Sequence, residues 1–175
     1  INGNISFLIR PIMPKVEEEE TAHRHNYQEI LWLKNGKGQH AIDDKVLEIK
    51  ANTCYLIGTG QVHRFIYGQD LEGFLIRFAD NFLPVRDLNT STTFITTFMQ
   101  KEATNSLCFF ETEQIVIHQL TTQIFKEFQQ IEEYGQLPIL QHLLTVLLIK
   151  LEQKSRVVSR QELSIINDYR KQHYQ

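Results

Sequence analysis

The sequence predicts a mainly β fold with added helices, in which a small barrel or sandwich is followed by an α-helical hairpin. From Phe7 to about Phe82, short apolar stretches and turn signals alternate at intervals of about 8 to 12 residues. Beyond Leu83-Pro84, apolar residues recur instead at helical spacings of three and four. With 175 residues, 42% of them hydrophobic, the chain has enough apolar mass for one core.

The first half is a series of short predicted strands, each ended by a turn signal. Ile30–Leu33 runs into Asn35-Gly36, the dipeptide typical of a two-residue turn, so we expect a hairpin there. The later stretches end similarly: Gly38–Ile42 at Asp43-Asp44, Val46–Ile49 at Ala51-Asn52, Cys54–Ile57 at Gly58–Gly60 and Val62–Tyr67 at Gly68–Asp70, before Phe74–Phe78 closes the series.

The second half is predicted to be helical. A short helix is expected in the Thr-rich segment Thr90–Thr97, and Leu107–Phe110 is either one more strand or an apolar tether. A first long helix is predicted from about Thr112 to Tyr134, ended by Gly135. His118 and His142 have polar neighbours, so we expect both at the surface.

A second long helix follows, with Pro138 in its first turn. The short loop before it requires the two helices to run antiparallel. The apolar stripe of this second helix is wide enough to contact the chain's own core on one side and a second copy of the chain on the other, so the helix is a candidate dimer helix. A helix buried within one subunit would have the same pattern. The stripe comprises Leu140, Leu143, Leu144, Leu147, Leu148 and Leu151.

Charge and cysteine content restrict the function. The net charge of −3 excludes a domain that is wholly a nucleic-acid-binding surface. Cys54 and Cys108 lie in apolar runs and are interpreted as small buried side chains, which favours a reducing cytoplasm. We expect no membrane association, because no stretch approaches the roughly 20 apolar residues of a membrane span.

The most informative segment is His23-Arg-His25-Asn-Tyr-Gln-Glu29. His23, His25 and Glu29 share parity, so on a strand they can face one side. His63, just after a turn, offers a third imidazole. Three neutral imidazoles and one carboxylate suit a divalent metal such as Zn, Ni, Fe or Mn.

These residues resemble the two motifs of the cupin superfamily, in which two His and a Glu from one motif and a His from the next hold a metal inside a β-barrel. The first motif is matched from His23 through Gly36, with Glu17 at a position where the family has glycine. The second is looser, with Asn52 and Gly58 replacing the usual glycine and proline. The resemblance implies a cupin-like barrel, the double-stranded β-helix.

A closer resemblance is to the N-terminal sensor domain of AraC-family transcription regulators. It rests on His-Arg-His-Asn-Tyr-Gln-Glu-Ile-Leu-Trp at 23–32, Gly-Gln-Val-His-Arg-Phe at 60–65 and Gly-Phe-Leu-Ile-Arg-Phe at 73–78, and it covers about residues 5 to 83. It implies a barrel that senses a small molecule, a hairpin that dimerises, and DNA binding by a C-terminal helix-turn-helix domain absent from this chain.

The resemblance predicts a division into a sensor barrel (1–83), a connecting segment with a short helix (84–110), a helical hairpin for dimerisation (111–154) and a linker (155–175) toward that missing domain. The segment Gln161–Gln175 still has a helical pattern. Because the chain begins without Met and stops inside this pattern, we expect it to be a fragment of a longer protein.

Two functions remain in competition. The first is a non-catalytic effector-sensing and dimerising domain, with a sugar or small acid as effector and no required cofactor. The alternative is a metal-dependent cupin enzyme, a dioxygenase or isomerase, with His23, His25, Glu29 and His63 as metal ligands. Arg77 either faces solvent or binds an anionic group. The predicted effector-binding or barrel-lining residues are His23, His25, Tyr27, Glu29, Trp32, His40, Tyr55, His63, Phe65 and Arg77.

Overall fold

The computed structural model describes residues 6–17, 21–83, 105–130 and 134–173. In chain order its elements are β1 (Phe7–Pro11), β2 (Gln28–Ile42), β3 (Lys45–Ile49), β4 (Thr53–Ile57), β5 (His63–Phe78), β6 (Ser106–Cys108), α2 (Thr112–Phe128) and α3 (Gln136–His173). The predicted order of a β domain followed by a helical hairpin is confirmed. The strands pair antiparallel in the order β1-β5-β2-β4-β6, and β3 pairs with β2 outside this path.

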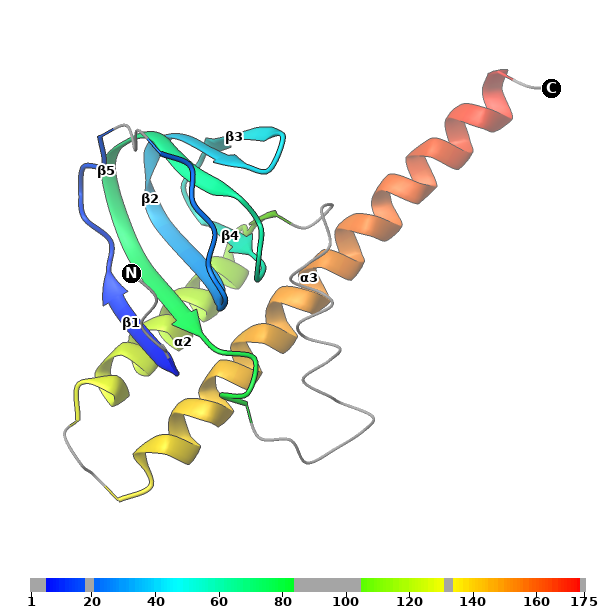
Figure 1. Ribbon diagram of the computed structural model, residues 1–175. Coiled ribbons are helices and arrows are strands. Elements are labelled where there is room, and N and C mark those ends of the chain that lie inside the picture. The colour runs from blue at the N-terminus through cyan, green and yellow to red at the C-terminus, as the bar shows by residue number, and fades with distance from the viewer. Residues whose placement is uncertain (1–5, 18–20, 84–104, 131–133, 174–175) are drawn as a thin grey trace.

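The two longest strands, β2 and β5, pair along their whole length (Figure 1). The hairpin predicted at Asn35-Gly36 is wrong, because β2 continues through it with register shifts on either side of Asn35. Gly36 has a φ of 132°, and a Cβ there would lie 2.7 Å from the Leu71 side chain, so the glycine permits an irregularity and a close approach. The break predicted at Gly68–Asp70 is also wrong, since β5 runs through it.

The turn at Asp43-Asp44 is where β2 reverses. Ile42 pairs with Lys45, and Asp43 has a φ of 52°, as a two-residue hairpin turn requires. The Asp43 carboxylate accepts hydrogen bonds from the Val62 backbone N–H at 3.0 Å and from the Gln61 amide at 2.8 Å. The turn is thereby fixed to the segment that leads into β5.

Successive side chains of β2 point to opposite faces of the sheet and enter two different apolar cores. Leu31 and Leu33 pack in a core on one face of the sheet, which also contains Tyr55 and Leu75. Ile30 and Trp32 face the opposite side, where the second core lies between the sheet and the helices. One strand therefore carries side chains into both layers.

The helices α2 and α3 pack side by side against that second core (Figure 1). All six leucines of the predicted dimer stripe belong to it: five are buried members and Leu143 packs partly buried against them. Burial inside the chain's own core leaves these leucines little surface for contact with a second copy. No helix of the described residues is long and apolar enough to cross a membrane.

The helix ends differ from the predicted bounds. The first helix was predicted to reach Tyr134, whereas α2 ends at Phe128 with Gln129 as its C-cap. The helical pattern after Gln161 is confirmed, because α3 continues without interruption to His173. Its C-terminal part extends away from the sheet and α2 (Figure 1). The short helix predicted at Thr90–Thr97 lies outside the described residues.

Candidate functional site

A cavity of about 340 Å³ opens on the side of the sheet away from the helices, and we call it the barrel cavity. Its floor contains an ion pair between Glu29 of β2 and Arg77 of β5, which are partners in the strand register. Arg77 Nε donates to Glu29 Oε2 at 2.7 Å, and the Glu29 side chain is only 3% exposed. Of the two predicted positions for Arg77, facing solvent or binding an anionic group, the structure has the second, and the anionic group is the Glu29 carboxylate. The cavity is lined by Arg10, Ile12, Met13, Lys15, Val16, Glu17, His23, Glu29, Leu31, His63, Phe65, Leu75 and Arg77.

His25 lies beside this ion pair. Its Nδ1 is 2.8 Å from the backbone oxygen of Tyr27, and its Nε2 is 3.8 Å from Glu29 Oε2. Because a carbonyl oxygen can only accept, Nδ1 carries the proton and Nε2 presents a lone pair. Burial lowers the pKa of His25 to about 4, which keeps the ring neutral at physiological pH.

His63 and His40 form a second part of the cluster. His40 Nε2 lies 3.1 Å from His63 Nδ1, and the His40 ring stacks on Phe65 with 4.6 Å between centroids. Burial lowers the pKa of His40 to about 4, and burial together with the neighbouring imidazoles lowers that of His63 to about 2. Both rings are therefore neutral.

His23 joins the cluster from the surface. Its backbone pairs with that of His63 through hydrogen bonds of 3.0 Å and 2.8 Å, and the two rings are 4.4 Å apart. The side chain lines the barrel cavity but is exposed. The shared strand parity expected for His23 and Glu29 does not arise, because β2 begins only at Gln28 and His23 contributes an isolated bridge.

The cluster has three donor atoms that can hold a metal ion. One atom each from His25, Glu29 and His63 lies within 4.8 Å of the others, and two imidazoles with a carboxylate suit zinc or iron. His23 is not part of this converging group. The Arg77 guanidinium already bonds the carboxylate and is a competing cation. The imidazole and carboxylate groups are thus suitable ligands for a metal ion. The ion pair of Arg77 with Glu29 instead favours a cluster held together by hydrogen bonds without a metal.

The two predicted tyrosines occupy different surroundings. Tyr27 stacks on His25 at 3.9 Å and lies under the Arg77 guanidinium, so it supports the cluster from its edge. Tyr55 lies in the barrel core but does not line the cavity; its hydroxyl donates to the Glu48 carbonyl at 2.7 Å, and burial raises its pKa to about 12.

Trp32 does not reach the barrel cavity, because it faces the helices. Its Nε1–H donates to Nδ1 of His118 at 3.3 Å, and its ring packs against Phe109. The prediction of a surface position is therefore wrong for His118, which is half-buried, whereas His142 is exposed as predicted. Trp32 is three residues after Glu29, and on a strand such residues face opposite sides of the sheet. This spacing is the signal that would have placed Trp32 on the helix side and Glu29 on the cavity side.

Sequence reasoning missed the rim of the barrel cavity. Arg10 and Lys15 contribute cations there, and the apolar wall includes Leu31 and Leu75. Arg10 pairs with Leu75 in the register of β1 with β5, which places both on the cavity face. No motif marks Lys15, because it lies between strands and reaches the cavity only through the fold.

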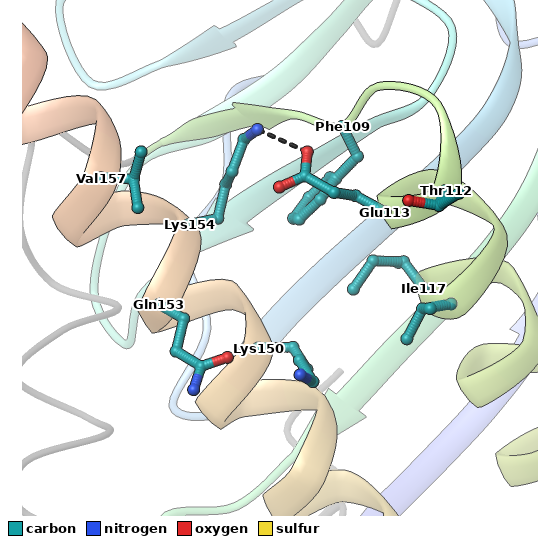
Figure 2. Close-up of a pocket in the computed structure, with 9 residues that line it drawn as sticks. Phe109, Thr112, Glu113, Ile117, Lys150, Gln153, Lys154 and Val157 are labelled. Carbon is teal, nitrogen blue, oxygen red and sulfur yellow. Dashed lines mark hydrogen bonds and ion pairs between the residues drawn. The ribbon is translucent and has the colours of Figure 1, made fainter.

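A second hollow, of about 260 Å³, lies between the start of α2 and the middle of α3 (Figure 2). Figure 2 shows Lys154 bonded to Glu113, and the distance between Nζ and Oε2 is 2.6 Å. The Lys154 ammonium also lies 5.6 Å from the centre of the Phe109 ring. The hollow is mostly apolar and contains none of the predicted site residues.

Comparison with known proteins supports the resemblance. Residues 18–84 match the family of AraC-like ligand binding domains. Among solved structures, apo ToxT from Vibrio cholerae is 14% identical with a TM-score of 0.50, and the match covers 89% of this chain and 59% of that one. The AraC-like transcriptional activator CuxR is 11% identical with a TM-score of 0.47, over 71% of this chain and 43% of that one.

A cupin-2 domain protein from Shewanella frigidimarina is 23% identical with a TM-score of 0.35, over 42% of this chain and 71% of that one. No curated protein sequence matches the chain. The chain spans 43% of the length of CuxR and 59% of that of ToxT. The predicted cupin-like fold with two following helices is confirmed, and residues 18–84 match the family of AraC-like ligand binding domains.

Proposed function

We propose that the barrel cavity binds a small effector, and that the helices dimerise the chain so that the effector controls DNA-binding domains outside it. The observation that carries the proposal is the composition of the cavity. A buried ion pair lies beside apolar walls, together with His63, whose Nε2 has no hydrogen-bond partner among the described residues. A few convergent polar groups in an apolar cavity are typical of a small-molecule site.

The effector is a sugar or a small acid. Glu29, which lines the cavity, can accept hydrogen bonds from hydroxyl groups. Arg10 and Lys15 at the rim can attract a carboxylate, although Lys15 is also paired with Glu17 at 3.0 Å. The volume of about 340 Å³ lies within the usual range for such sites.

Filling the cavity should weaken effector binding strongly. We expect Val16→Trp, on the cavity wall, to weaken binding by more than about tenfold, because the indole occupies the space of the ligand. Isothermal titration with a panel of sugars and small carboxylic acids measures the change. Val62→Trp is the matched control, since Val62 is 37% exposed and does not line the cavity. Equal affinity in wild type and Val16→Trp would place the effector elsewhere.

Dimerisation is assigned to the outer face of α3. Ile139, Val146, Ile149 and Val157 are 42%, 43%, 44% and 47% exposed, and their spacing places them along one stripe opposite the buried leucines. Val157 also borders the hollow of Figure 2, which continues this surface toward α2. An apolar stripe on a long helix pairs well with the same stripe of a second copy.

A charge on that stripe should separate the dimer without unfolding the chain. We expect Ile149→Asp to weaken association by at least about tenfold, because a carboxylate would be buried against an apolar partner. Sedimentation equilibrium gives the dissociation constant, and circular dichroism checks the fold. Val46→Asp, on an exposed position of β3, controls for the added charge. Wild-type protein that stays monomeric at high concentration would refute the assignment.

A metal-dependent cupin enzyme remains the second candidate, because His25, Glu29 and His63 converge. Metal analysis of the purified chain separates the two functions. Stoichiometric iron or manganese that is lost in His25→Ala would favour the enzyme.

A further inference from the structure

His40 and His63 share one hydrogen bond, so the tautomers of the two rings are linked. His40 is fully buried, and its Nε2 lies 3.1 Å from Nδ1 of His63. With both rings neutral, one nitrogen of this pair carries the proton and the other offers a lone pair. When His40 donates, the proton of His63 is on Nε2, and when His63 donates, its Nε2 is a bare lone pair.

The surroundings of His63 Nε2 favour a proton on that atom. His25 presents only a lone pair on Nε2, because its Nδ1–H donates to the Tyr27 carbonyl. The Glu29 carboxylate also presents only acceptors. The donor atoms of His25, Glu29 and His63 all lie within 4.8 Å of one another. An N–H from His63 is attracted to the other two groups, whereas a third lone pair would repel them.

The buried side of His40 favours the same arrangement. Its Nδ1 has no hydrogen-bond partner among the described residues. If His63 donated to His40, that Nδ1 would carry the second proton of the pair as a fully buried N–H without an acceptor among the described residues. Such a group keeps its full desolvation cost. A metal ion on His63 Nε2 requires this costly arrangement, because a ligating nitrogen must offer its lone pair. In the opposite arrangement the proton lies on His63 Nε2, which also has no hydrogen-bond partner there, but His63 lines the barrel cavity and lies beside the acceptors of Glu29 and His25, so a bound ligand can accept from it.

We propose that His40 is a positioning residue that holds His63 in the tautomer protonated on Nε2, so that the cluster receives a hydroxyl group of the effector in place of a divalent metal ion. A hydroxyl accepts from His63 and donates to Glu29, both of which line the cavity. The inference rests on the proposed function, since it specifies how the same cavity selects its ligand. The tautomer can nevertheless be measured without an effector, so that either idea can fail alone.

The first test needs no substitution in the measured protein. Long-range ¹H–¹⁵N correlation spectra of the ¹⁵N-histidine-labelled chain, recorded at neutral pH without metal or effector, distinguish the two tautomers. His63→Asn assigns the His63 signals. We expect the proton on Nε2, and a proton on Nδ1 would overturn the proposal. Failure to find an effector would leave this result unchanged.

The second test replaces the donor with an acceptor. In His40→Glu, the carboxylate can only accept from His63 Nδ1, so we expect the His63 proton to move there and zinc to bind about tenfold more tightly. Titration with zinc chloride measures the affinity. Ala41→Glu adds the same charge at the neighbouring position of β2 and should leave both readouts unchanged.

If His40→Glu does not fold, His40→Gln supplies an uncharged amide oxygen for the same measurement. A purely structural His40 would lower stability without improving zinc binding. Zinc affinity equal to or weaker than that of the wild type in the folded variant would therefore refute the proposal.

Discussion

Replacing Arg77 by methionine is expected to lower the free energy of unfolding by about 3 to 5 kcal/mol. The variant removes the guanidinium that bonds Glu29 Oε2 at 2.7 Å and leaves a carboxylate that is 3% exposed without this partner. A buried charge that loses its counter-charge keeps the desolvation cost and loses the attraction. Urea denaturation followed by circular dichroism measures the change.

Lys34→Met provides the matched control. Lys34 and Glu72 also form an ion pair, at 2.9 Å, but their side chains are 43% and 57% exposed. Water screens such a pair, so we expect a loss below about 1 kcal/mol. Adding Glu29→Gln to Arg77→Met should restore part of the stability by removing the buried charge. Equal losses for Arg77→Met and Lys34→Met would show that the buried pair has no special role.

Acidification from pH 7.5 to pH 5.5 is expected to lower the free energy of unfolding by about 2.5 kcal/mol through His40 and His63. Their pKa values are about 4 and about 2 in the fold, against 6.5 for the free side chain. Below pH 6.5 the unfolded chain binds protons that these buried rings do not, so the stability present above pH 6.5 is lost as the pH falls. His25, with its pKa near 4, acts in the same direction.

Urea titrations at several pH values measure this dependence. His40→Gln removes one of these three groups and should reduce the slope by about a third. A flat profile of the wild type over this interval would contradict the burial of the cluster.

The sequence predicts well those features that depend on local patterns. The reversal at Asp43-Asp44 and the strand Thr53–Ile57 follow from turn residues and β-branched or aromatic runs. The helical spacing from Thr112 predicts the start of α2. These features need only neighbouring residues, so a single sequence suffices for them.

The errors arise where distant segments override a local signal. Asn35-Gly36 has the composition of a turn, but β5 pairs with β2 on both sides of it and extends the strand through it. The leucines of α3 have the pattern of either an interface or a core, and the packing of the sheet on that helix decides for the core. The conformational preference of a short segment contains no information about a strand or helix that packs against it from a distant part of the sequence.

The candidate site divides in the same way. The motif predicts Glu29, His25 and His63 as neighbours, and the structure brings them together. The ion pair of Glu29 with Arg77 depends on the register between β2 and β5, which no spacing within one segment reveals. Aromatic residue type is the only signal that predicts Tyr27, Tyr55 and Trp32 as lining of one cavity, and the fold places them in different surroundings.

The chain has a single tryptophan, and its position makes it a natural optical reporter. Trp32 lies on the strand that carries Glu29 into the barrel cavity, yet its indole bonds His118 of α2. An effector that shifts β2 relative to the helices would change the surroundings of this one fluorophore. Intrinsic fluorescence of the unmodified chain would therefore report a change in the contact between the sheet and the helix pair.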